Sequence, residues 1–148
     1  MRFVLFVRFS AWLTVAVLLS VACSGCQRGP YPTYRAGGTV AYQDGTALKQ
    51  GEVEFSPIDA KRPITSKGRI QPDGTFTLTT FYPDDGAVEG EHLAIVIPQV
   101  PEDRQITAFQ AGIIDPNFMR YETTPLRFTV SRNASDNQFH IVVTRPRS

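Results

Sequence analysis

The most reactive side chains in this 148-residue chain belong to Cys23 and Cys26, its only two cysteines. A CxxC spacing is used by redox pairs and by half of a zinc site. A zinc site needs two further ligands, and the chain's only histidines are His92 and His140. A redox pair needs a thioredoxin-like βαβ context, whereas these cysteines end an apolar N-terminal segment. We therefore expect neither chemistry.

The apolar segment before the cysteines has the layout of a secretory signal. Its only charges are Arg2 and Arg8, an apolar core runs over residues 9–22, and small residues follow. The core of about 14 residues is shorter than the roughly 20 that a helix needs to cross a bilayer. We therefore expect export followed by cleavage, with an uncleaved signal anchor as the alternative.

The stretch Cys23-Ser24-Gly25-Cys26 resembles the lipobox of bacterial lipoproteins. In that motif, the cysteine after a small residue receives a diacylglyceryl group and becomes residue one after cleavage. The resemblance favours Cys26 as the lipidated residue, with Cys23 as the alternative. Gln27, and not Asp, follows Cys26, and by resemblance to the lipoproteins of diderm bacteria this favours transport to the outer membrane of the cell envelope.

This resemblance divides the chain into a signal peptide over residues 1–25, a tether over residues 26–36 and a domain over residues 37–145. A single acyl chain binds a membrane only marginally, whereas two or more hold firmly. The first partner expected from the sequence is therefore a membrane, reached through a lipid anchor.

From residue 37 onward, the chain is a series of short runs in which apolar and polar residues alternate, as in strands with one wet face. The alternating runs are 38–42, 51–55, 75–79, 126–130 and 138–143, with 67–71 as a weaker candidate. Residues 93–97 are apolar at every position, which predicts a central strand covered on both faces.

Turn pairs separate these runs. Asp44-Gly45 and Asp73-Gly74 supply the positive φ that tight turns need. The only helical signal is a turn near residues 115–121. About seven short strands separated by such turns predict one all-β domain, a Greek-key β-sandwich.

One long pattern of glycines, turns and apolar residues runs through the domain. It comprises Gly38-Thr-Val-Ala-Tyr-x-Asp44-Gly45, Gly51-x-Val53-x-Phe55-x-Pro57, Gly68-x-Ile70-x-x-Asp73-Gly74-x-Phe76-x-Leu78, Ile114-Asp115-Pro116 and Thr124-Pro125-Leu126-x-Phe128-x-Val130. The pattern resembles carboxypeptidase-regulatory-like domains, and among them the small predicted lipoproteins of planctomycete bacteria. The resemblance implies a transthyretin-like sandwich, and it implies little about function because a fold does not fix a function.

Candidates for catalysis and metal binding are few. The chain has no Gly-x-Ser-x-Gly motif and no cysteine after Cys26. His92 and His140 lie in strand-like runs, His140 on the wet face, so each is expected to be a solvated or hydrogen-bonded strand histidine. Asp84 and Asp85 adjoin a glycine, which favours a turn over a calcium site. We predict no catalytic residue, no metal site and no cofactor.

The charge of the chain argues against a nucleic-acid partner. Without Arg2 and Arg8, the chain has 13 basic and 14 acidic residues. A near-neutral domain has no electrostatic attraction for phosphate backbones. We therefore expect a non-catalytic binding or structural module at the cell envelope, with a protein or a glycan as its partner.

Two alternatives stay open. Aromatic residues in or near loops could stack on sugar rings, as in a carbohydrate-binding module; they are Tyr31, Tyr34, Phe81, Tyr82, Phe109, Phe118 and Tyr121. The second alternative is an enzyme like the hydroxyisourate hydrolases, a transthyretin-like subfamily with His and Arg in a dimer cleft and a Tyr-Arg-Gly-Ser ending. This chain ends Thr-Arg-Pro-Arg-Ser, without that Tyr and Gly, so we expect no such activity.

Overall fold

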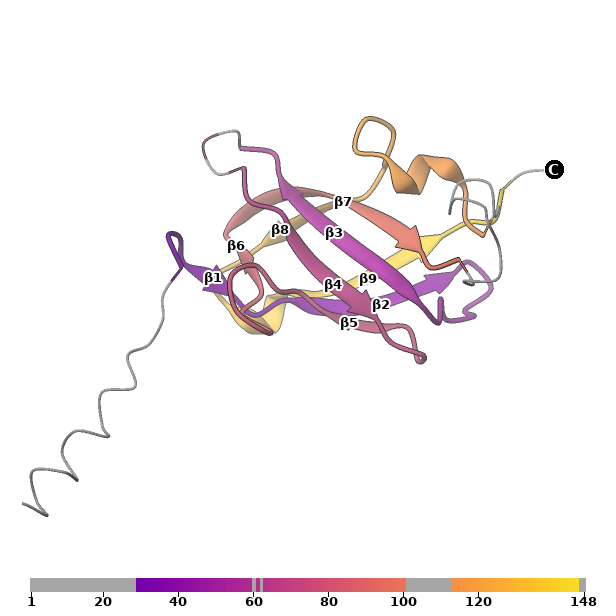
Figure 1. Ribbon diagram of the computed structural model, residues 1–148, viewed down its shortest axis with the longest axis horizontal. Coiled ribbons are helices and arrows are strands. Elements are labelled where there is room, and N and C mark those ends of the chain that lie inside the picture. The colour runs from indigo at the N-terminus through magenta and orange to yellow at the C-terminus, as the bar shows by residue number, and fades with distance from the viewer. Residues whose placement is uncertain (1–28, 60, 62, 101–112, 147–148) are drawn as a thin grey trace, which may run out of the picture.

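The computed structural model describes residues 29–59, 61, 63–100 and 113–146, and in these residues the chain is an all-β sandwich (Figure 1). The strands are β1 (Thr33–Tyr34), β2 (Gly37–Tyr42), β3 (Gly51–Pro57), β4 (Ser66–Ile70), β5 (Thr75–Thr77), β6 (Ala87–Val88), β7 (Gly90–Pro98), β8 (Arg127–Val130) and β9 (Gln138–Val143). Two short 3-10 helices, η2 (Pro116–Met119) and η3 (Ala134–Asp136), precede β8 and β9.

The strands form two facing layers and one small pair. One layer is a four-stranded sheet in the order β4-β3-β7-β8, and the other is a three-stranded sheet in the order β5-β2-β9. The pair β1-β6 lies at the end of the sandwich where the described chain begins, and the last residues of β9 lie at the opposite end (Figure 1). All pairings are antiparallel except that of β2 with β9, in which Gly37 lies opposite Gln138 and Tyr42 opposite Val143.

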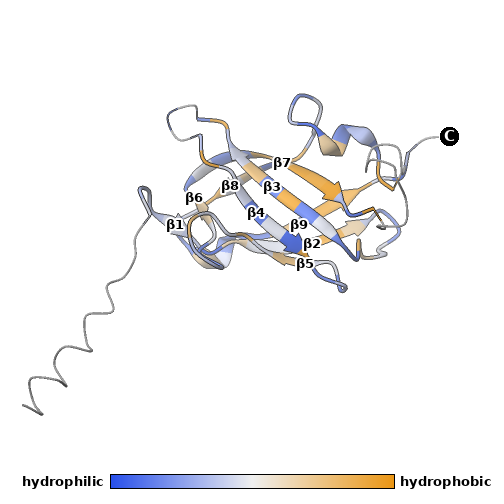
Figure 2. Ribbon diagram, viewed as in Figure 1, coloured by the Kyte–Doolittle hydropathy of each residue, from blue (hydrophilic) through white to orange (hydrophobic). Residues whose placement is uncertain are grey.

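The core fills the space between the two layers because each strand turns its apolar alternate residues inward. The four-stranded sheet contributes buried side chains such as Val53, Phe55 and Val96, and the three-stranded sheet contributes Val40, Phe139 and Ile141. Figure 2 shows this alternation along β3.

Aromatic rings join the two layers at the centre of the core. The centroid of Phe55 lies 6.3 Å from that of Phe76 and 5.4 Å from that of Phe139, and Phe128 lies 5.0 Å from Phe139. Tilted aromatic pairs at such distances are favourable beyond the area that they bury.

The central strand predicted from the apolar run is confirmed. β7 lies between β3 and β8. On its inner face Ala94 and Val96 are fully buried, and on its outer face Ile95 is only 5% exposed. The segment after η2 reaches this outer face, where Tyr121 contacts Glu54, the residue opposite Ile95.

The all-β prediction is confirmed, and each predicted strand is present within a few residues of its expected bounds. Seven strands of three or more residues are described, as expected. Gly45 and Gly74 have φ of 82° and 84°, so both turn pairs supply the positive φ for which glycine is favoured. The turn near residue 115 is the 3-10 helix η2, which Asp115 caps through Asn117 N–H.

Two short strands were not predicted. β1 and β6 have two residues each, too few for a period to be visible in the sequence. β1 lies inside the segment that we expected to be a tether, so the sheet structure begins before residue 37. Neither 3-10 helix, nor any other helix in the described part of the chain, is long and apolar enough to cross a membrane.

Candidate binding groove

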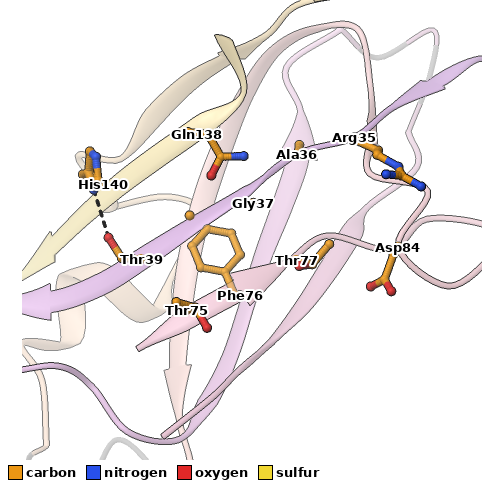
Figure 3. Close-up of a pocket in the computed structure, with 11 residues that line it drawn as sticks. Arg35, Ala36, Gly37, Thr39, Thr75, Phe76, Thr77, Asp84, Gln138 and His140 are labelled. Atoms are coloured by element: carbon orange, nitrogen blue, oxygen red, sulfur yellow. Dashed lines mark hydrogen bonds between the residues drawn. The ribbon is translucent and has the colours of Figure 1, made fainter. Parts of the chain in front are cut away.

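The outer face of the three-stranded sheet carries a shallow groove of about 520 Å³ (Figure 3). It arises because the polar alternate residues of β5, β2 and β9 all point to this face. The residues that line it are Arg35, Ala36, Gly37, Gly38, Thr39, Thr75, Phe76, Thr77, Asp84, Gln138 and His140.

The strand register arranges the groove as two rows of side chains. Thr77, Gly37 and Gln138 lie side by side in one row, and Thr75, Thr39 and His140 in the next. Gly37 has no side chain, so the middle of the first row stays open. A Cβ at Gly37 would lie 2.5 Å from the carbonyl oxygen of Phe76, so a larger residue there would also strain the sheet.

Opposite charges flank one end of the groove. Arg35 and Asp84 are exposed, and Figure 3 shows both at the end away from His140. The backbone at both positions is fixed. Nδ2 of Asn137 donates to the carbonyl oxygen of Arg35 at 3.1 Å, and the backbone N–H of Asp84 donates to Oγ1 of Thr79 at 3.1 Å.

A hydroxyl and an imidazole pair at the other end. Oγ1 of Thr39 lies 2.9 Å from Nδ1 of His140, and the pair is exposed to solvent. His140 is therefore on the wet face, as its strand position predicted.

A second, smaller groove of about 220 Å³ adjoins the first across β5. The two share Thr75, Phe76, Thr77 and Asp84, and the second adds the outward side chains of Lys67 and Arg69 from β4. An extended ligand could therefore contact both sheets across the β4–β5 side of the sandwich.

His92, the other histidine, lies in the core. It is fully buried on β7, with its ring centroid 6.1 Å from that of Phe55. Its Nδ1 lies 3.0 Å from the carbonyl oxygen of Gly90, while Nε2 is buried without a hydrogen-bond partner in the described structure. Burial lowers the pKa of His92, and the hydrogen bond to Gly90 opposes this effect only in part.

The two neighbouring aspartates organise a loop. The carboxylate of Asp85 accepts hydrogen bonds from the backbone N–H groups of Thr80, Phe81 and Tyr82 at 2.7, 3.0 and 3.1 Å. Asp84 adopts a positive φ of 58°. This is the turn geometry that the sequence favoured. Within the described residues, no three His, Cys, Asp or Glu side chains gather as metal ligands would.

The loop aromatics do not share one surface. Phe118 is buried in the core, and Tyr34 packs against the core. The hydroxyl of Tyr121 donates to Oε2 of Glu54 at 3.1 Å. Tyr31, Phe81 and Tyr82 are half-buried near β1 and lie outside the groove. Among Phe, Tyr and Trp residues, the groove is lined only by Phe76, which is 3% exposed. Phe109, Cys23 and Cys26 lie outside the described residues.

Single groove residues can be recognised in the sequence, but the groove itself cannot. In the alternating runs 38–42, 75–79 and 138–143, the residues Thr39, Thr75, Thr77, Gln138 and His140 stand at the polar positions. What was missing was the order β5-β2-β9, which places three segments from distant parts of the chain side by side.

Comparison with known proteins finds no matching family model, no matching curated protein and no matching solved structure.

Proposed function

We propose that this chain is an exported lipoprotein, anchored by acyl chains on Cys26 to the outer membrane, whose β-sandwich is a non-catalytic module that binds saccharides of the envelope in the groove. The resemblance to carboxypeptidase-regulatory-like lipoproteins is part of this proposal, and the sandwich supports it. The observation that supports saccharide binding is the composition of the groove, which combines hydroxyl, amide, imidazole, guanidinium and carboxylate groups on one open face.

Saccharide binding in the groove would depend on hydrogen-bond complementarity. Each sugar hydroxyl both donates and accepts, so it is matched by side chains such as Thr, Gln, Arg and Asp. The volume of about 520 Å³ lies within the range of small-molecule sites, roughly 300–1,000 Å³. A protein partner would be expected to use exposed apolar or aromatic anchors, which the groove lacks.

The groove is tested by saccharide binding to the mature chain carrying Cys26→Ser, with peptidoglycan fragments and a glycan array as probes. We expect saturable binding that weakens in Arg35→Ala, Thr77→Ala and Gln138→Ala. Thr129→Ala, an exposed threonine on the other sheet, is the matched control and should bind as the parent does. Binding that is lost only in Tyr82→Ala would assign the site to the loop aromatics instead.

The anchor is tested separately by acyl labelling in a bacterial host. Cys26→Ala is expected to block processing and abolish the label, whereas Cys23→Ala should keep it. A label that survives in Cys26→Ala and disappears in Cys23→Ala would move the anchor to Cys23. Fractionation of the labelled protein then tests its place in the outer membrane.

One observation favours hydrolysis as a second candidate. A hydroxyl 2.9 Å from an imidazole, as in Thr39 and His140, has the geometry of a nucleophile and its general base. Such a base is normally oriented by a third group, and among the described contacts His140 has only Thr39. Turnover of hydroxyisourate or another hydrolysable substrate by the mature chain, abolished in His140→Ala, would replace the binding proposal by an enzymatic one.

A further inference from the structure

The end of the sandwich where the described chain begins carries part-exposed aromatic side chains. Tyr31, Phe81 and Tyr82 are half-buried there, and Ile58, in the loop after β3, is 42% exposed. Figure 1 shows β1, β6 and the C-terminal end of β3 at this end, opposite the last residues of β9. We call these four residues and their loops the aromatic end.

The distance from the proposed anchor to this end is short. Gly29, the first described residue, comes three positions after Cys26, with only Gln27 and Arg28 between them. An extended chain covers at most about 3.6 Å per residue, so Gly29 lies within about 11 Å of an acylated Cys26.

The residues from Gly29 onward add no length to the tether, because they already pack against the aromatic end. A Cβ at Gly29 would lie 2.1 Å from the ring of Phe81, so the backbone rests directly on that ring. Thr33 pairs with Val88 in the β1-β6 ladder, and its hydroxyl donates to Oδ2 of Asp85 at 3.4 Å. An anchor at Cys26 therefore brings the aromatic end, and not another face of the sandwich, to the bilayer.

The side chains at this end suit the boundary between lipid and water. Tyr and other aromatic rings concentrate at the headgroup level of membranes, where an apolar body and a polar tip are both satisfied. Charges of both signs are present, including Arg132 and Glu89, which pair at 3.0 Å. Attraction to anionic lipid is therefore not the driving force, and binding should persist at high salt.

We propose that the aromatic end docks on the interface of the bilayer that holds the anchor, with Phe81 and Tyr82 at headgroup depth. This inference rests on the proposed lipidation of Cys26. It also places the far end of β9, with the exposed Val142, away from the membrane and leaves the groove open along the side of the sandwich.

Tryptophan reporters test the docking in the processed lipoprotein. The chain's only tryptophan, Trp12, lies in the predicted signal peptide, so a new tryptophan is the sole one after cleavage. Tyr82→Trp reports on the aromatic end, and Val142→Trp, at a residue 50% exposed, is the matched control at the other end. Ile58→Trp gives a second reporter at the aromatic end if Tyr82→Trp does not fold.

The acylated variants are reconstituted into phosphatidylethanolamine–phosphatidylglycerol vesicles with brominated acyl chains. We expect about a twofold loss of emission from Tyr82→Trp or Ile58→Trp, at low and high salt, and none from Val142→Trp, since an indole at the interface lies within reach of the bromines. Equal quenching at both ends, no quenching, or quenching lost at high salt would overturn the docking. In each of those cases the protein should still sediment with the vesicles. Failure to sediment would contradict the proposed lipid anchor, and the docking proposal would fail with it.

Discussion

Oγ1 of Thr39 lies 2.9 Å from Nδ1 of His140, although the two residues are 101 positions apart in the chain. They meet because β2 and β9 pair in parallel with Thr39 opposite His140. The contact joins the first long strand to the last one and fixes one end of the groove.

This relationship predicts the effect of Thr39→Val on saccharide binding. Valine keeps the shape of threonine but removes the hydroxyl, so one hydrogen-bonding group of the groove is lost. A hydrogen bond contributes about 0.5–1.5 kcal/mol, which corresponds to a Kd raised roughly two- to tenfold. Calorimetric titration measures the change, and the Tm should stay close to that of the parent because the site is exposed. An unchanged Kd would contradict a role of Thr39 in the groove.

Asn137 is expected to be a main stabilising polar residue. It is fully buried, its Nδ2 donates to the carbonyl oxygens of Arg35 and Ser131, and its Oδ1 accepts from the N–H of Ser131. Asn137→Ala leaves these backbone groups unpaired, so we expect stability to fall by about 1–3 kcal/mol in urea unfolding. Asn117→Ala is the control, because Asn117 is exposed and its side chain makes no hydrogen bond among the described residues; it should change stability by less than about 0.5 kcal/mol.

His92 should make the fold sensitive to acid. Burial lowers the pKa of His92 in the folded state, so near and below its ordinary pKa of about 6.5 the unfolded state binds the proton more readily. Stability is therefore present above that pH and is lost as the pH falls below it. In His92→Leu, the change in unfolding free energy between pH 7.5 and pH 5 (roughly one unit either side of the ordinary pKa) should be smaller than in the parent.

The matched control is His140→Gln, because His140 is exposed on the same sandwich. It should lose less of the pH dependence than His92→Leu does, because it keeps the buried imidazole of His92. If both histidine variants lose the same amount of pH dependence, buried His92 is not its source.

Tyr121 is predicted to stabilise the outer face of the four-stranded sheet. Its hydroxyl donates to Glu54, which also pairs with Lys67. Burial and the neighbouring Glu54 charge raise the pKa of Tyr121, so the hydroxyl stays protonated and donating at neutral pH. Tyr121→Phe should lower stability by about 1 kcal/mol, the scale of one hydrogen bond at a partly exposed site. Tyr82→Phe, whose hydroxyl has no hydrogen bond in the described structure, should leave the urea midpoint unchanged.

The strands could be predicted from the sequence because their signal is local. The alternation of apolar and polar residues around Phe55, Leu78 and Ile141 predicts which side chains face the core. A period of two depends only on adjacent residues. The same logic placed His140 on the wet face. The burial of His92 could not be predicted in this way, because His92 borders a run without alternation. Only the packing of the two sheets shows that His92 is buried.

The proposed anchor and the proposed export signal rest on the sequence alone, through the apolar segment and the position of Cys26. The groove was decided by tertiary structure. Arg35, Thr75 and Gln138 gather there because β2 pairs with β5 on one side and, in parallel, with β9 on the other. Strand partners are chosen by the fit of whole faces against a shared core, and no short stretch of sequence contains that fit. For this protein, the sequence determined the strands and the proposed anchor, and the tertiary structure decided which of their outward residues form a site.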